Sequence, residues 1–213
     1  MGSLHLIRHG QASFGAADYD QLSALGYEQS SSLGVSWEAS GWEPAAAVAG
    51  GMARHAQTAI AAIDASGAGD GYDVDAGWDE YDHLALAKAQ DSTAMGSDAK
   101  AFQRTLNVAL EGWMAGEPGP GETYETFRSR VLASFDAVVA QATSGRQIAV
   151  FTSGGPIALV ASHLLAGDDS LFRRINDVIV NASVTTVIVG ASGPRLLAFN
   201  ETGHLPRDMV TFR

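Results

Sequence analysis

The sequence predicts an α/β fold, a three-layer sandwich in which helices cover both faces of a mostly parallel central sheet. Short apolar runs alternate with longer amphipathic segments through most of the chain. Glycine-containing loops follow several of the apolar runs, as is common at the ends of buried strands. The last two apolar runs are separated only by residues 191–194, which predicts a closing hairpin and therefore one antiparallel strand.

The first part of the chain contains two predicted strand–helix pairs. Residues 4–7 form an apolar run that ends in a charged pair and a glycine, which indicates a buried strand followed by a functional loop. Helical spacing of apolar residues predicts a helix over residues 23–39. Residues 45–51 then predict a short strand with a glycine exit, and residues 53–67 a helix that ends at a glycine.

The second part begins with a glycine-rich loop, residues 67–73. Residues 101–116 place Phe102, Leu106 and Trp113 on one face, which predicts an amphipathic helix before the breaker "GEPGPGE". The remaining predicted elements are a helix through residues 127–138, a strand and turn at 146–155, a helix at 156–167 with proline in its first turn, and closing strands at 183–190 and 195–200.

Length and composition favour one globular domain. The chain has 213 residues, of which 46% are hydrophobic, so it is long enough to bury a sizeable core. We expect a single domain over residues 1–213 with an inserted lid at roughly 70–121. No signal peptide or membrane-length apolar stretch is evident, so the cytoplasm is the default location; the oligomeric state stays open.

The charge and the missing cysteines exclude several classes of function. A formal net charge of -11 argues against non-specific nucleic-acid binding and against binding to a membrane surface through basic residues. An acidic protein that binds an anion must do so with locally placed arginines. The sequence has no cysteine, which excludes disulfides, thiol catalysis and cysteine-ligated metals. No cofactor and no metal are expected, because His9 is not in a metal-ligand spacing.

Three loops that follow predicted strands are candidates for the functional site, since ligands bind at the carboxyl ends of strands in such sheets. They are the Arg8-His9-Gly10 loop, the segment before Arg54, and residues 152–155. Arg8 and His9 put a fixed cation beside an imidazole, which is a competent nucleophile towards phosphorus when cations absorb the phosphoryl charge. Gly10 would let the backbone approach a ligand. Arg54, a cation unfavourably placed at a helix N-terminus, also suits an anion-binding role.

An ordered set of motifs resembles the histidine phosphatase superfamily, also called the phosphoglycerate mutase-like family. "LIRHGQAS" resembles its signature, and "GYEQSSSLG", "ARHAQTA", "WDEYDH", "GET" with a later arginine, and "NETGHL" resemble its further motifs in the same order. "VFTSGGPIA" stands where the family normally has a Ser-His-Gly-Gly type sequence. The resemblance spans nearly the whole chain and implies the phosphoglycerate mutase-like fold.

The resemblance also implies roles for individual residues. His9 would attack phosphorus and form a phosphohistidine, while Arg8 and Arg54 would hold the phosphoryl oxygens. Glu80 would protonate the leaving alkoxide and then activate water, for which its pKa should be raised towards neutrality. Asp79 and Asp82 lie close to Glu80 in sequence, which makes this the less specific assignment.

Two positions depart from the family pattern. Gly15 occupies the place of a frequent asparagine, so one phosphate contact is expected to be missing. Ser153 replaces the second histidine, and its neutral hydroxyl would be a weaker donor, at a cost of roughly 1–2 kcal/mol. The amides of Gly154 and Gly155 could still face the phosphate from a helix N-terminus. Ser153→His is expected to raise activity or leave it unchanged, where geometry permits.

Other side chains are candidates to supply what the second histidine would have given. His204 and His83 are the first of these, and His55, which adjoins Arg54, ranks below them. Gln11, beside the signature motif, is an additional candidate for the site.

The function predicted from these residues is hydrolysis of a small phosphomonoester through a phosphohistidine intermediate. One alternative is a catalytically weak or inactive member that binds a phosphorylated ligand. A phosphoglycerate mutase is less favoured, because residues 70–90 hold one lysine and no arginine for a second anion. A serine hydrolase using Ser153, Asp177 and His204 is the least favoured, because it leaves Arg8 and His9 unexplained and the G-x-S-x-G motif is incomplete.

The predicted lid also carries aromatic residues that bear on the substrate. They are Trp78, Tyr81, Phe102 and Trp113. They favour an apolar or aromatic portion in the substrate, or equally the packing of a core.

Overall fold

The computed structural model describes residues 1–13, 20–67, 71–93 and 99–212. The expectation for Gly15 and part of the predicted lid therefore fall outside the described residues. The strands are β1 (Gly2–Arg8), β2 (Ala46–Ala49), β3 (Asp73–Val74), β4 (Gln147–Thr152), β5 (Val184–Gly190) and β6 (Gly193–Glu201). The α-helices are α1 (Ala24–Ser40), α2 (Ala53–Ser66), α3 (His83–Gln90), α4 (Ala99–Met114), α5 (Tyr124–Gln141), α6 (Gly154–Ala166) and α7 (Phe172–Asn176), with 3-10 turns at Ala76–Trp78 and Arg207–Met209.

The six strands form one sheet in the order β3-β2-β4-β1-β5-β6. Neighbouring strands from β3 to β1 are parallel, while β5 pairs antiparallel with both β1 and β6. Strand β5 therefore runs opposite to the other five, which confirms the predicted mostly parallel sheet with one antiparallel strand. The hairpin between β5 and β6 lies where the sequence placed it.

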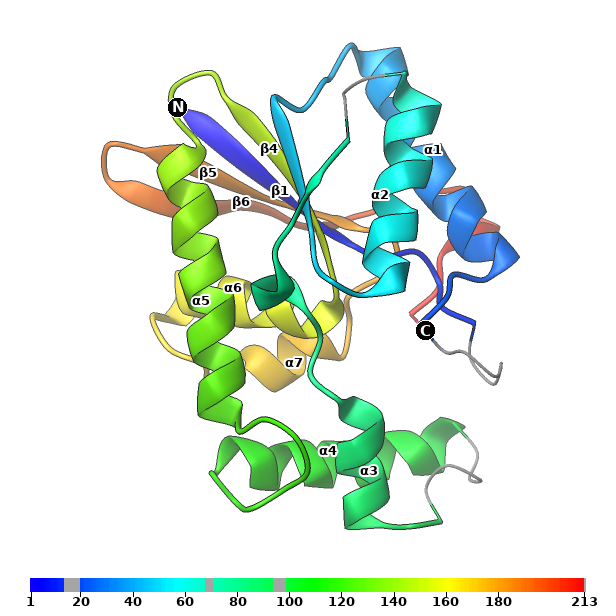
Figure 1. Ribbon diagram of the computed structural model, residues 1–213, viewed down its shortest axis with the longest axis vertical. Coiled ribbons are helices and arrows are strands. Elements are labelled where there is room, and N and C mark those ends of the chain that lie inside the picture. The colour runs from blue at the N-terminus through cyan, green and yellow to red at the C-terminus, as the bar shows by residue number, and fades with distance from the viewer. Residues whose placement is uncertain (14–19, 68–70, 94–98, 213) are drawn as a thin grey trace.

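Helices cover both faces of the sheet, and the strand residues divide between two apolar cores (Figure 1). Leu4 and Leu6 of β1 and Val150 of β4 belong to the core beneath α5 and α6. Ile7 and Phe151, which point the other way from the same strands, belong to the core beneath α1 and α2. This alternation is the period-two pattern of strands that are buried on both sides. It confirms the predicted three-layer sandwich.

The helices α3 and α4 lie apart from the two sheet faces, beyond one end of α5 (Figure 1). They pack against each other, and α4 also contacts α5. The carboxylate of Asp82 accepts a hydrogen bond from the Ala85 amide at 2.9 Å and so caps the start of α3. The sequence prediction contained neither α3 nor α7, because such short helices carry too few periodic positions to be recognised.

The long helices begin and end within a few residues of their predicted bounds. Ser23 caps α1 by accepting a hydrogen bond from the Gly26 amide, and the left-handed Gly41 ends that helix. Pro156 lies in the first turn of α6, where a missing amide hydrogen costs little, as predicted. No helix in the described part of the chain has both the length and the apolar character needed to cross a bilayer.

Candidate active site

The three predicted site loops lie at the same edge of the sheet. Strands β2, β4 and β1 are adjacent and parallel, so the residues that follow them come together. A cavity of about 470 Å³ lies at this edge. Its described wall residues are Arg8, His9, Gln11, Ala12, Ser13, Ser23, Arg54, Glu80, Tyr81, His83, Phe102, Gln103, Leu106, Gly154, Asn176, Asp177, Asn181 and Phe212.

His9 is held in one orientation at the end of β1. Its amide donates to the Thr152 carbonyl at 2.8 Å, which ties the loop to β4. Its Nδ1 lies 2.7 Å from the Gly10 carbonyl, which can only accept, so this nitrogen carries the hydrogen. Burial, followed by the charges of Arg54 and Arg8, holds the pKa of His9 well below its ordinary value. The ring is therefore neutral at physiological pH, and Nε2 keeps the free lone pair that a nucleophile needs.

Gly10 allows the loop after β1 to pack closely against α1. A Cβ at this position would lie 2.3 Å from the Gly26 carbonyl oxygen of α1. The Gly10 amide donates to the hydroxyl of Thr58 on α2, at 3.1 Å. The loop that carries His9 is thus held against both helices of one face.

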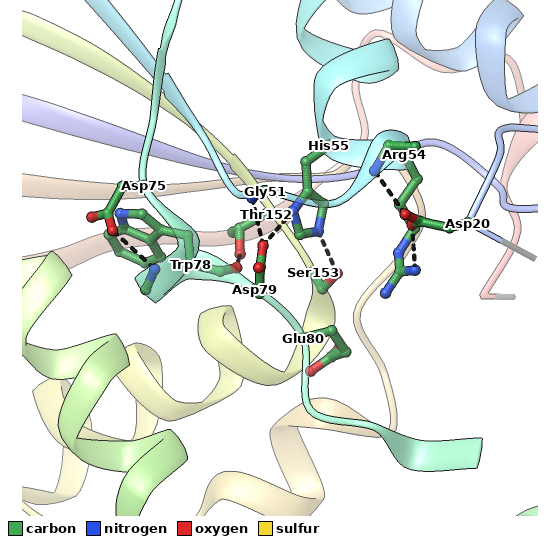
Figure 2. Close-up of polar contacts among 12 residues, drawn as sticks. Asp20, Gly51, Arg54, His55, Asp75, Trp78, Asp79, Glu80, Thr152 and Ser153 are labelled. Carbon is green, nitrogen blue, oxygen red and sulfur yellow. Dashed lines mark hydrogen bonds and ion pairs between the residues drawn. The ribbon is translucent and has the colours of Figure 1, made fainter. Parts of the chain in front are cut away.

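The two arginines reach the cavity from different elements and are fixed by different partners. Arg8 donates through one guanidinium nitrogen to the carbonyl oxygens of Ile179 and Phe212, the latter at 3.0 Å. Arg54, at the start of α2, forms a 2.8 Å ion pair with Asp20. Asp20 also accepts from the Ala53 amide at 2.8 Å, which places an acid at the N-terminus of α2 as its dipole favours (Figure 2).

Glu80 lies across the cavity and is held by backbone amides. Its carboxylate accepts from the Gly155 amide at 3.0 Å and from the Tyr81 amide at 3.2 Å. A Cβ on residue 155 would lie 2.1 Å from a Glu80 oxygen, so only glycine leaves room for this contact. Burial raises the pKa of Glu80, although the amide of Gly155 and the charge of Arg54 oppose the shift. A carboxyl group with a raised pKa can act as an acid in one step and a base in the next.

The turn between β4 and α6 uses its two glycine amides in different ways. Gly154 lines the cavity. The Gly155 amide instead donates to the Glu80 carboxylate. Ser153 between strand and helix has no exposed surface, and its backbone angles of -118° and 175° are ordinary extended values.

His55 contacts Ser153, and the sequence had not predicted this contact. Its Nε2 lies 2.7 Å from the Ser153 hydroxyl, and its Nδ1 lies 3.7 Å from a carboxylate oxygen of Asp79 (Figure 2). The His55 and His9 ring centroids are 5.9 Å apart. The sequence ranked His55 below His204 and His83, because nothing in a helix pattern shows which neighbour a side chain will meet across the sheet.

The other candidates are divided between the wall and its surroundings. His83 lines the cavity, and burial lowers its pKa to about 4, so it is neutral at physiological pH. Gln11 also lines the cavity, and its side-chain oxygen accepts from the Ser23 hydroxyl at 3.0 Å. His204 is not among the described wall residues; it interacts with the backbone of Ala182.

The rest of the cavity wall combines residues that the sequence had named, such as Tyr81 and Phe102, with residues that it had not. Tyr81, Phe102 and Leu106 give it an apolar part, whereas Trp78 and Trp113 are buried in the main core. Further polar wall residues are Gln103, Asn176, Asp177 and Asn181, and the side-chain amide of Asn181 donates to the His9 carbonyl at 3.4 Å. The Asn176 amide donates to the Tyr81 hydroxyl at 3.0 Å, which fixes both side chains. Among these residues, the sequence had not named Gln103 on α4, or Asn176 and Asn181 at and after the end of α7.

Within the described ranges, no group of three or more His, Cys, Asp or Glu side chains is arranged to hold a metal ion.

Comparison with known proteins gives a family match over most of the chain. The sequence profile of the "Histidine phosphatase superfamily (branch 1)" matches residues 4–202. None of the curated proteins has a sequence similar enough to count as a relative.

Several solved structures share the fold at low sequence identity. A phosphoglycerate mutase from Bacillus anthracis str. Sterne superposes with a TM-score of 0.72 at 18% identity, covering 95% of this chain and 94% of its own. A phosphoserine phosphatase mutant from Entamoeba histolytica, in complex with phosphoserine, gives 0.69 at 18% identity, covering 97% and 100%. The α-ribazole phosphatase from Shigella flexneri gives 0.68 at 16% identity, covering 94% and 96%.

Proposed function

Because this chain belongs to the histidine phosphatase superfamily (branch 1), we propose that it hydrolyses a small phosphomonoester through a phosphohistidine on His9. One observation carries the proposal. The Gly10 carbonyl fixes the hydrogen of His9 on Nδ1 and leaves Nε2 unprotonated in a cavity that also holds two arginines. That combination provides the nucleophile and the positive charge that transfer of a phosphoryl group requires.

In the first step, Nε2 of His9 attacks phosphorus and the bond from phosphorus to the ester oxygen breaks. The leaving oxygen takes the bonding electron pair and a proton from Glu80. Arg8, Arg54 and the Gly154 amide neutralise the charge on the phosphoryl oxygens as the bonds change. Arginine suits this task because its planar guanidinium can bind two oxygens and stays charged.

In the second step, the Glu80 carboxylate removes a proton from water as the water oxygen attacks phosphorus. The bond from phosphorus to Nε2 breaks, His9 regains its lone pair, and inorganic phosphate leaves. The raised pKa of Glu80 supports both roles, since the same carboxyl group must hold a proton before the first step and accept one in the second.

The far side of the cavity favours a neutral and partly apolar leaving group. Arg8 and Arg54 are the charged bases among the described wall residues, and both stand on the phosphoryl side. Asp177, which also lines the cavity, would repel a second anion. This supports hydrolysis over phosphoglycerate mutation, which needs further cations for a carboxylate or second phosphate. We infer that the segment bearing α3 and α4 is the lid that contacts this leaving group.

We also infer that Ser153 occupies the place of the family's second histidine. It follows β4 directly, beside the His9 loop, and begins the turn into α6. A serine nucleophile is not supported by its surroundings. Ser153 has no exposed surface, and it is absent from the described cavity wall.

The test is turnover of 4-nitrophenyl phosphate by the purified wild-type protein and by His9→Ala. We expect turnover by the wild type and its loss in the variant, with both proteins folded by circular dichroism. Trapping with ³²P-labelled substrate should give a phosphoprotein that is stable to base and labile to acid, as phosphohistidine is. Undiminished turnover by His9→Ala would remove the proposed nucleophile, and acid-stable label on Ser153 would favour serine chemistry.

The same experiment separates the phosphatase from a member that only binds phosphorylated ligands. Such a member would bind inorganic vanadate or phosphate in calorimetry and release no phosphate from any aryl or alkyl ester tested. Binding without His9-dependent turnover would therefore refute hydrolysis and support the binding protein.

A further inference from the structure

His55 makes a buried polar contact that the proposed mechanism does not use. The side chain has no exposed surface, and its Nε2 lies 2.7 Å from Ser153 Oγ. Gly50 makes room for it, because a Cβ at residue 50 would lie 2.2 Å from the His55 Nδ1. Burying a polar ring costs desolvation, whereas an apolar side chain could fill the same space without that cost. A buried histidine at this position therefore indicates a function.

The second nitrogen of the His55 ring faces an acid. Nδ1 lies 3.7 Å from Asp79 Oδ1, within ion-pair range but beyond hydrogen-bond distance. That Asp79 oxygen also accepts from the Gly51 amide at 2.5 Å, which fixes the carboxylate in place. Asp79, His55 and Ser153 thus form a line of polar groups. It runs from the loop after β2, where Asp79 accepts from Gly51, to the start of α6 (Figure 2).

The Ser153 end of this line adjoins the nucleophile. Thr152 pairs with Arg8 across the sheet, and its carbonyl accepts from the His9 amide at 2.8 Å. Ser153 and His9 are thus the residues that directly follow the paired ends of β4 and β1, and Gly154 lines the cavity. The centroid of the His55 ring is 5.9 Å from that of the His9 ring.

We propose that His55 is a positioning residue that supports the bound phosphoryl group through Ser153, so that the second imidazole of the site comes from α2 and not from the turn after β4. In the empty site, Ser153 donates its hydroxyl hydrogen to Nε2 of His55. When a phosphoryl group binds, His55 takes up a proton from solvent and donates from Nε2 to Ser153, whose hydroxyl hydrogen rotates away from the ring. This bond holds the turn whose next residue, Gly154, lines the cavity. The inference rests on the proposed function, because it assigns His55 to that same site.

The charges around His55 explain why ligand binding would change its protonation. Burial lowers its pKa, and Arg54 lowers it further, while Asp79 and Asp20 act in the opposite direction. The neighbouring His9 is neutral. A phosphoryl dianion beside Arg54 offsets the arginine charge and leaves Asp79 to stabilise an imidazolium. We therefore expect His55 to take up a proton from solvent when the ligand binds.

Exchange of the imidazole between the two positions is the direct test. His55→Ala should lower kcat for 4-nitrophenyl phosphate on the order of tenfold or more with a smaller change in KM, because the support acts on the reacting group. Ser153→His alone should lower activity further, since the new ring would compete with His55 for the same space; this reverses the expectation from sequence. The double variant His55→Ala/Ser153→His should recover much of the activity. His163→Ala, a histidine near the end of α6, is the matched control and should match the wild type.

A second measurement needs no turnover and avoids variants that pack poorly. Inorganic vanadate binding is followed by calorimetry in two buffers with different ionisation enthalpies, for the wild type and for His55→Gln. Glutamine keeps a hydrogen-bonding amide at this position and cannot take up a proton. We expect the wild type to take up more protons per vanadate than the variant near neutral pH, and to bind more tightly.

The outcomes separate this inference from the proposed function. Equal proton uptake and affinity in the wild type and His55→Gln would overturn the role of His55, whatever the activity. A double variant no more active than either single variant would overturn the exchange of the imidazole. Absence of His9-dependent turnover in the wild type would instead refute hydrolysis, while His55-dependent vanadate binding would still support the assignment of His55.

Discussion

The phosphoryl side and the leaving-group side of the cavity are built in different ways. Arg8 and His9 stand directly at a strand end, and Arg54 begins a helix that packs on the sheet, so the backbone of the main fold positions them. Phe102 and Leu106 lie on α4, away from the sheet, where side-chain packing between short helices sets their position (Figure 1). The phosphoryl side holds its side chains in a geometry set by the sheet. Side chains on the leaving-group side can be substituted without disturbing the sheet.

The largest loss after that of His9 itself should come from Arg54 on the phosphoryl side. Arg54→Ala should lower kcat/KM for 4-nitrophenyl phosphate by roughly 10²–10³, because it removes a charged donor to the phosphoryl oxygens. Arg54→Lys should recover only part of this, since lysine cannot bind two oxygens at once. Arg195→Ala on the distant β6 serves as the control. Equal kinetics for Arg54→Ala and this control would show that Arg54 serves only its ion pair with Asp20.

If Glu80 is the general acid, the rate of turnover should depend on pH. Loss of the Glu80 proton should slow formation of the phosphoenzyme from alkyl phosphates as pH rises through the raised pKa of Glu80. Glu80→Gln should lose this alkaline decline and be slowed on the order of tenfold to a hundredfold, most for leaving groups of high pKa. Steady-state rates for a series of alkyl and aryl phosphates check this. A variant affected equally for every leaving group would argue against Glu80 as the general acid.

Stability should change with pH in the matching sense. The folded pKa of Glu80 is raised above its ordinary value of 4.5, so the favourable contribution of the protonated form is full below that pH and is lost as pH rises through the folded pKa. Glu80→Gln, which never ionises, should therefore gain stability relative to the wild type between acidic and neutral pH. Denaturant unfolding of both proteins at several pH values measures the difference. A gap that does not widen with pH would contradict the raised pKa.

Changes on the leaving-group side should alter selectivity more than chemistry. Phe102→Leu should change the ratio of kcat/KM for 1-naphthyl phosphate and methyl phosphate by several-fold, since it reshapes the apolar part of the wall. The kcat for 4-nitrophenyl phosphate should change less. Val108→Leu, an exposed position on the same helix, is the control. An unchanged ratio would mean that the leaving group does not reach α4.

The smallest expected effect concerns the cap of α3. Asp82→Ala removes the acceptor for the Ala85 amide and should cost about 0.5–2 kcal/mol of local helix stability. Because α3 packs on α4, hydrogen exchange should increase in both helices while the sheet keeps its protection. Faster exchange throughout the sheet as well would show that the two sides of the cavity are not independently stabilised.

The sequence was most informative where local pattern and chemistry coincide. Three elements are close to their predicted places: the strand that ends at Arg8, the helix that begins at Ala53, and the turn after β4. Each combines an apolar period with glycine or proline at its boundary. The sequence was least informative for α3 and α7, whose short lengths show little periodicity, and for wall residues such as Gln103 on α4 and Asn176 on α7.

The sequence by itself determined the fold class and the residues that meet at the carboxyl ends of adjacent parallel strands, because strand order and chain direction bring such loops together. Only the tertiary structure decided which side chains touch across that edge. It placed His55 against Ser153, gave the Gly155 amide to Glu80, and left His204 outside the described wall. Those contacts depend on how α2 and α6, which lie on opposite faces of the sheet, approach each other at its edge. No local pattern in the chain predicts how close the side chains of two such helices come.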